Sequence, residues 1–320
     1  MILAFPLLWG LGAVAGYLYA KDRGIPMETV LAVLPAFLLE VSFFYTLGVE
    51  GLRTRLERQK PWVLALLLVA AAVAPYCVAA LLLHAFSWQS VGLLAALAGV
   101  AAFWYVLLPE RPSVDILFLV FIAVIYLLKL FAKIYPAAHP RVPMAILGQL
   151  MWFRTGLFAM VSIHRTRDIG FGFWPTAREW GIGLLYFVML IPAVGVLAWA
   201  IDFTHLHVRY AEFTKFSLVA IGTFFGILWV VALGEEFFFR GLLQQWLTAW
   251  TGKPWMGLVL ASMLFGSVHF WYGQFPNWRF ASLAAVAGLF YGMAFRKAKS
   301  IRASMVTHAL TVTAWRLFFS

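Results

Sequence analysis

The sequence predicts an all-α fold, a polytopic transmembrane helical bundle of about ten or eleven spans around an intramembrane polar cavity. Hydrophobic residues make up 64% of the 320 residues and charged residues only 12%, against about 25% charged in soluble domains. Apolar segments close to the length of about 20 residues that crosses a bilayer recur along the whole chain. Because these segments are continuously apolar and do not alternate, a transmembrane β-barrel is excluded.

The candidate spans are the apolar runs between charged or turn-forming loops. They are 2–20, 28–49, 62–86, 90–108, 114–134, 143–163, 180–201, 216–250, 255–271, 281–295 and 302–319. Gln149 and Arg154 interrupt the run 143–163, so it is either a span or a buried or interfacial helix. The run 216–250 would measure about 52 Å as one helix, against a hydrocarbon core of about 30 Å, and must tilt, kink or protrude.

The chain is strongly basic, with a formal net charge of +11 that in a soluble domain would point to nucleic acid. Here the basic residues gather in short loops such as 51–61 and 296–302, where membrane orientation and anionic headgroups account for them. We therefore expect membrane lipids as partners and no nucleic acid. Cys77 is the only cysteine, which excludes a disulfide framework and a cysteine-based metal site.

The most polar and turn-rich connection in the chain is 164–179. It divides the sequence into an N-terminal transmembrane accessory region, 1–163, and a C-terminal core, 180–320. All candidate site residues lie in this core.

Two adjacent carboxylates, Glu235 and Glu236, lie inside the apolar run 216–250. One charged residue at the centre of a membrane helix costs about 2.5–3.5 kcal/mol, so such a residue indicates a functional site when a partner can be named. Arg240 is that partner, because Glu236 and Arg240 are i and i+4 on a helix. Glu235 points about 100° away and is left available for chemistry.

Two histidines follow on the next spans. His269 comes four residues after Phe265, and His308 lies in the last apolar run. A carboxylate beside imidazoles suits general-base activation of water, with the imidazoles polarising a carbonyl or binding a metal. This combination of residues favours amide hydrolysis near the membrane surface. No His-Glu-x-x-His motif occurs, so a zincin-type site is excluded.

Two other polar features are interpreted as structural. His205 and His207 are spaced like a metal pair but lie in a polar loop, and we expect them to be solvated. Glu40 lies inside a predicted span without a partner near it in sequence. It is either a structural hydrogen-bonding group or part of the lining of a substrate path.

Three ordered motifs resemble the CPBP (Abi) family of intramembrane proteases, which includes CAAX-prenyl proteases and bacteriocin-processing proteins. The motifs are Glu235-Glu236-x-x-x-Arg240, Phe265-x-x-x-His269 and His308 in the last span. The resemblance covers about 180–318 and implies an endopeptidase that acts on a membrane-associated peptide or protein near its C-terminus. It also implies an integral protein of the bacterial inner (cytoplasmic) membrane.

The resemblance implies a role for each matching residue. Glu235, with Glu236, would activate water and His269 would assist, while His308 would help to bind the oxyanion and Arg240 would fix Glu236. Members of the family are often called metalloproteases, and a divalent metal such as zinc at Glu236, His269 and His308 is an open alternative. The family's usual Asn or Asp four residues after the last histidine is Val312 here, and Thr311 could supply a hydroxyl instead.

Two other function classes fit parts of the pattern. A catalytically silent scaffold or immunity-type binding protein is favoured by Val312, and it should tolerate Glu235→Gln. A proton- or ion-coupled transporter could use Glu235 and the histidines as a path, but such transporters are built from repeated halves, and no repeat is visible in the sequence.

Overall fold

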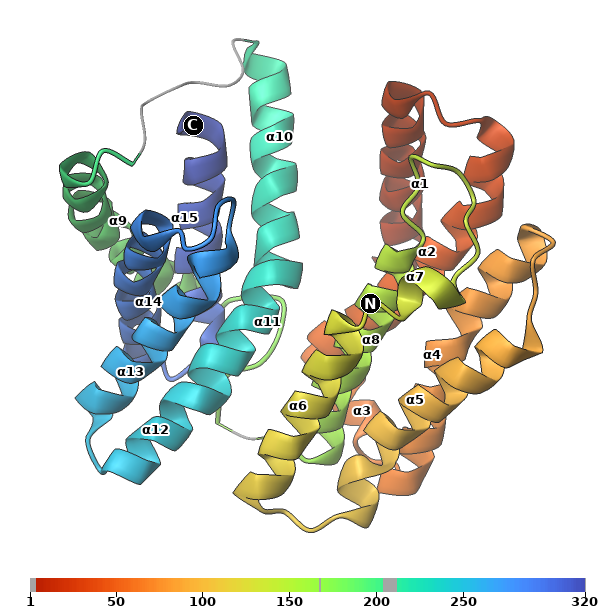
Figure 1. Cartoon of the computed structure of the whole chain (residues 1–320), viewed down its shortest axis with the longest axis horizontal. Coiled ribbons are helices and arrows are strands. Elements are labelled where there is room, and N and C mark those ends of the chain that lie inside the picture. Colours follow the sequence, from red (N-terminus) through yellow and green to blue (C-terminus); the bar gives the residue numbers. More distant parts are fainter. Residues whose placement is uncertain (1–3, 167, 204–211, 320) are drawn as a thin grey trace. The chain divides into compact units, whose positions relative to one another are not determined.

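The computed structural model describes residues 4–166, 168–203 and 212–319, which form a chain of helices without a β-strand (Figure 1). The chain forms two compact units, an N-terminal unit of residues 1–166 and a C-terminal unit of residues 167–320. Their boundary falls in the polar connection 164–179. The predicted all-α fold is confirmed.

Eight helical segments in the described part of the chain are long and apolar enough to cross a membrane. They are Met27–Gly48, Pro61–Leu82, Trp88–Leu107, Ala145–Ile163, Ala177–Ala200, Phe213–Thr251, Pro254–Trp271 and Trp278–Ala298. The three other predicted spans are also helical but fall outside these eight: α1 (Ala4–Arg23), α6 (Pro112–Leu127) and α15 (Ile301–Phe318). A polytopic helical membrane protein is thus confirmed, with eight segments that meet the length and composition of a span.

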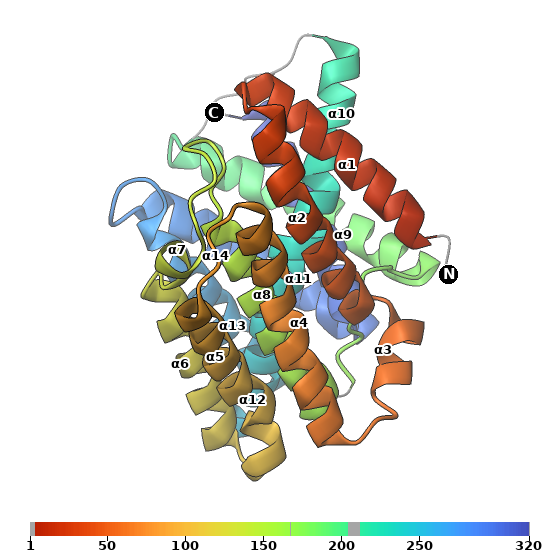
Figure 2. The ribbon, with the colours of Figure 1, turned by 90° about the vertical axis from the view of Figure 1, so that its right-hand side faces the viewer.

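In the N-terminal unit, four helices run side by side (Figures 1 and 2). They are α2 (Met27–Gly48), α4 (Pro61–Leu82), α5 (Trp88–Leu107) and α8 (Ala145–Phe158), which continues as the π-helical segment η1 (Ala159–Ile163). The unit also contains α1, α6 and two short helices, α3 (Glu50–Leu56) and α7 (Phe131–Ile134). Buried small residues such as Ala72 and Ala98 allow the backbones of these helices to approach closely.

A buried ion pair lies among these helices. Arg154 Nε and Nη2 donate to the two carboxylate oxygens of Glu40 at 2.6 and 3.0 Å, and Nη2 also donates to the Ala71 carbonyl oxygen at 3.0 Å. Both side chains are at most 2% exposed. Glu40 therefore has a hydrogen-bonding partner, as the structural interpretation requires. The segment Ala145–Ile163, which carries Arg154, has the length and composition of a span, and most of it is buried inside the structure.

The C-terminal unit begins with α9 (Ala177–Ala200), whose first turn carries a capping box between Thr176 and Glu179. A long helical stretch of 39 residues follows. It consists of α10 (Phe213–Gly226), η2 (Ile227–Ala232), α11 (Leu233–Glu236), η3 (Phe237–Leu243) and α12 (Gln244–Thr251). Gly252 ends the stretch in the left-handed region, with φ of +66°.

Three more helices complete the C-terminal unit: α13 (Pro254–Ser267) with the 3₁₀ turn η4 (Val268–Trp271), α14 (Trp278–Ala298) and α15. Two glycines set their spacing. A Cβ on Gly266 would lie 2.6 Å from the Ala281 carbonyl oxygen of α14, and a Cβ on Gly183 would lie 2.6 Å from Val306 of α15. The first approach brings α13 against α14, and the second brings α9, which carries Gly183, against α15.

Candidate active site

The two glutamates lie on α11, a single α-helical turn between the π-helical segments η2 and η3. Such π-helical segments change the direction in which side chains project and are frequent at functional sites. The two side chains differ in exposure. The Glu236 side chain is completely buried, whereas that of Glu235 is 35% exposed.

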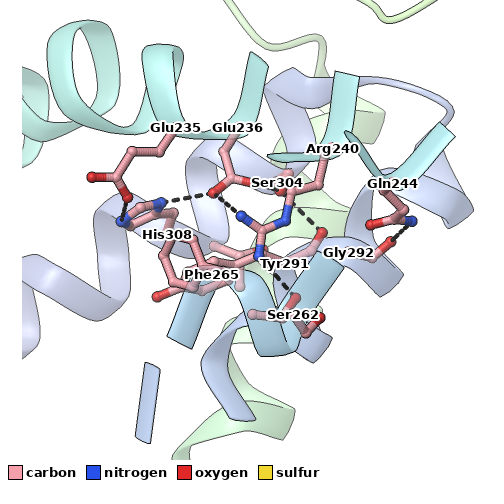
Figure 3. Close-up of polar contacts among 12 residues, drawn as sticks. Glu235, Glu236, Arg240, Gln244, Ser262, Phe265, Tyr291, Gly292, Ser304 and His308 are labelled. Carbon is pink, nitrogen blue, oxygen red and sulfur yellow. Dashed lines mark hydrogen bonds and ion pairs between the residues drawn. The ribbon is translucent and has the colours of Figure 1, made fainter. Parts of the chain in front are cut away.

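Glu236 is bonded on both of its carboxylate oxygens (Figure 3). Oε1 accepts from Arg240 Nη1 at 3.1 Å and lies 2.8 Å from His308 Nδ1, while Oε2 is hydrogen-bonded to the Ser304 hydroxyl. The predicted pair of Glu236 with Arg240 is therefore present. Because both oxygens are engaged and the side chain is buried, Glu236 is suited to orienting its neighbours.

The contact with Glu236 determines which nitrogen of His308 carries a proton. Arg240 next to Glu236 favours its ionised form, and an ionised carboxylate can only accept hydrogen bonds. His308 Nδ1 must therefore be the donor, which leaves Nε2 with a free lone pair in the neutral ring. Nε2 faces Glu235 at 3.8 Å from Oε2, and that oxygen is buried without a hydrogen-bond partner.

Arg240 is held from several sides. Its guanidinium lies over the rings of Phe265 and Tyr291, at 4.6 and 5.3 Å from their centroids. Nη2 also donates to the Gly288 carbonyl oxygen at 3.0 Å. A Cβ on Gly288 would lie 3.2 Å from Nη2, so a glycine at this position leaves room for the guanidinium.

His269 is close to this group but is separated from it by Phe265. Its Nδ1 lies 2.7 Å from the Phe265 carbonyl oxygen, and since a carbonyl only accepts, Nδ1 is the donor here too and Nε2 is free. The Phe265 ring contacts both imidazoles, with centroid distances of 4.7 Å to His269 and 5.8 Å to His308. In the described part of the chain, no hydrogen bond or ion pair joins His269 to either glutamate.

Some of the predicted site residues are in direct contact with one another, and others lie at the edge of the group. Side chains in direct contact at the centre are Glu235, Glu236, Arg240, Phe265 and His308. His269 lies at the edge of this group. The Thr311 hydroxyl donates to the Thr307 carbonyl oxygen at 2.7 Å, which orients it along its own helix.

A comparison of the sequence with family models shows which proteins the chain is similar to. Residues 217–314 match the family described as type II CAAX prenyl endopeptidase Rce1-like. The match includes both glutamates, both histidines and Thr311, and it confirms the resemblance found in the sequence. No curated protein and no solved structure matches the chain.

A divalent metal held by Glu236, His269 and His308 was the alternative to a metal-free site. The structure does not bring these three side chains together as metal ligands. Among the described residues, no three histidine, cysteine, aspartate or glutamate side chains lie close enough together to hold a metal ion. Both oxygens of Glu236 are already bonded, and His269 points its Nδ1 at a backbone carbonyl. In this arrangement Glu236, His269 and His308 do not fit a metal with three protein ligands.

Two contacts in the Rce1-like segment have no counterpart in the predicted site, those of Ser304 with Glu236 and of Tyr291 with His308. Ser304 carries a sequence signal, because it precedes His308 by four residues and shares its helix face. Tyr291 carries none, since it belongs to a different helix. His205 and His207, expected to be solvated, lie outside the described residues.

Proposed function

We propose that this chain is an intramembrane endopeptidase that hydrolyses a peptide bond near the C-terminus of a membrane-associated peptide or protein. The observation that carries the proposal is the facing of Glu235 Oε2 and His308 Nε2 at 3.8 Å, within the segment that matches the Rce1-like family. Glu235 is partly exposed and its Oε2 has no hydrogen-bond partner, so it can bind a water molecule.

In the proposed reaction Glu235 acts as the general base. It takes a proton from water while the water oxygen attacks the carbonyl carbon of the scissile peptide bond, giving a tetrahedral oxyanion. When the carbon–nitrogen bond breaks, the proton held by Glu235 passes to the leaving amine. The products are a carboxylic acid, which then releases its proton to water, and a free amine, and the Glu235 carboxylate is regenerated.

The other residues support this step. Glu236, fixed by Arg240 and Ser304, holds Nδ1–H of His308, so that Nε2 is directed toward the reacting atoms. In its protonated form His308 donates from Nε2 to the oxyanion. His269 assists from the edge of the site through its free Nε2, which can exchange a proton with the leaving amine.

The test compares wild-type protein with Glu235→Gln and His308→Gln in membranes, each variant present at an equal inserted level. Glu28→Gln is the matched control, because Glu28 is an exposed glutamate in the N-terminal unit. Mass spectrometry of the C-termini of membrane-associated peptides should show uncleaved precursors in both site variants. The control should process them as the wild type does.

Two other outcomes would contradict the proposal. If the membrane-associated peptides have the same C-termini in all four strains, the chain acts as a binding protein or scaffold, because a scaffold tolerates the isosteric change Glu235→Gln. If ion flux through liposomes is lost in Glu235→Gln while no peptide is cleaved by the wild type, the transporter alternative is favoured instead.

A further inference from the structure

Tyr291 of α14 lies flat against the imidazole of His308. The two ring centroids are 4.6 Å apart and the planes are inclined by only 13°. The tyrosine residue is 2% exposed, so it cannot contact a substrate directly. Figure 3 shows Tyr291, Phe265 and His308 grouped beneath the two glutamates.

Tyr291 is itself held in place from three directions. The Arg240 guanidinium lies 5.3 Å from the centroid of its ring, and Phe265 meets the ring at 5.9 Å and an angle of 75°. The Tyr291 carbonyl oxygen lies 3.0 Å from the Ser304 hydroxyl, the same hydroxyl that contacts Glu236.

These contacts complete the positioning of the histidine. The orientation of the imidazole plane depends on χ2 of histidine, the torsion about Cβ–Cγ, which has a broad and shallow energy profile. The hydrogen bond between Nδ1 and Glu236 restrains this torsion at one edge of the ring only. A second ring stacked on the imidazole plane restricts rotation about Cβ–Cγ and so determines where Nε2 points.

We propose that Tyr291 is a positioning residue, which holds the plane of His308 so that Nε2 faces Glu235. The stacked pair connects α14, which carries Tyr291, with α15, which carries His308. The role assigned to Tyr291 rests on the proposed hydrolysis by Glu235 and His308.

The kinetic test uses Tyr291→Phe, which keeps the ring, and Tyr291→Leu, which removes it. We expect kcat to stay within about twofold of the wild-type value in Tyr291→Phe and to fall about a hundredfold in Tyr291→Leu, with KM unchanged in both, because misplacement of a reacting group lowers the rate without weakening binding. Phe171→Leu is the matched control, a buried aromatic residue of the same unit outside the site. It should leave kcat unchanged in the folded fraction. A rise in KM with unchanged kcat in Tyr291→Leu would overturn the positioning role.

A second measurement does not depend on activity. In detergent-solubilised protein with isotope-labelled histidine, the stacked tyrosine should shift the His308 ring protons upfield, and His308→Gln identifies that signal. The shift should persist in Tyr291→Phe and vanish in Tyr291→Leu. If the shift behaves in this way but no variant and no wild-type protein cleaves peptides, the proposed function has failed and the contact of Tyr291 with His308 still stands. If the shift is unaffected by Tyr291→Leu, the inference is wrong.

Discussion

Both units of this protein bury a glutamate against an arginine, and the two pairs are bonded differently. In the N-terminal unit, Arg154 covers both oxygens of Glu40 and no histidine joins them. In the C-terminal unit, Arg240 contacts only one oxygen of Glu236, which leaves room for His308 and Ser304. The first pair is closed and can only connect helices. In the second pair, Glu236 also orients the His308 ring, whose Nε2 faces Glu235.

The comparison predicts opposite results from the same substitution in the two units. Glu236→Gln should lower kcat about a thousandfold or more, because the carboxamide carries no charge and can turn its NH2 group toward Nδ1, which favours the wrong tautomer of His308. Glu40→Gln should lower the free energy of unfolding but leave kcat of the folded fraction near the wild-type value. Turnover is measured at equal amounts of folded protein. Equal losses of kcat in both variants would show that Glu236 acts only through the fold.

Removing one partner of the closed pair should have the next largest effect. Arg154→Met leaves Glu40 buried without a counter-charge, so the free energy of unfolding should fall by about 3–5 kcal/mol. The double variant Glu40→Met/Arg154→Met should recover most of this loss, because neither buried charge remains. Equilibrium unfolding in mixed micelles measures both. A double variant as unstable as the single one would mean that the pair does more than neutralise charge.

The corresponding double change in the C-terminal unit is a control on that experiment. Glu236→Met/Arg240→Met also removes both charges, but it leaves His308 and Ser304 without their acceptor. It should therefore recover less stability than the N-terminal double variant and should not cleave substrate.

Ser304→Ala should have a smaller effect of the same kind as Glu236→Gln. It removes one hydrogen bond to the buried carboxylate, worth about 1–2 kcal/mol of stability, and should lower kcat about tenfold with KM unchanged. Ser282→Ala is the matched control, since the exposed Ser282 hydroxyl donates only to the Trp278 carbonyl oxygen of its own helix. Equal kcat in the two variants would argue against a role of Ser304 in holding Glu236.

Dialysis against a chelator should have the smallest effect, with no loss of cleavage. The described residues bring no three metal-ligating side chains together, and Glu236 has no free oxygen to offer. Cleavage rates before and after dialysis test this expectation. A loss that zinc restores would show that substrate binding rearranges Glu236, His269 and His308 into a metal site.

The sequence by itself determined everything that depends on short spacing or composition. Continuous apolar runs require helices in a membrane, because every backbone polar group must be satisfied within the segment. The pairing of Glu236 with Arg240 follows from i,i+4 geometry and is present in the structure. The three motifs were sufficient to indicate the family that residues 217–314 match.

Contacts between residues that are far apart in the sequence were decided only by the tertiary structure. Glu40 finds Arg154 across 114 residues, a partner that no local spacing indicates. The stacking of Tyr291 on His308, the position of His269 behind Phe265 and the direction of Nδ1 in both histidines depend on how α13, α14 and α15 pack. Helix periodicity fixes the face on which a residue lies, whereas the close approaches at Gly183 and Gly266 determine which faces meet.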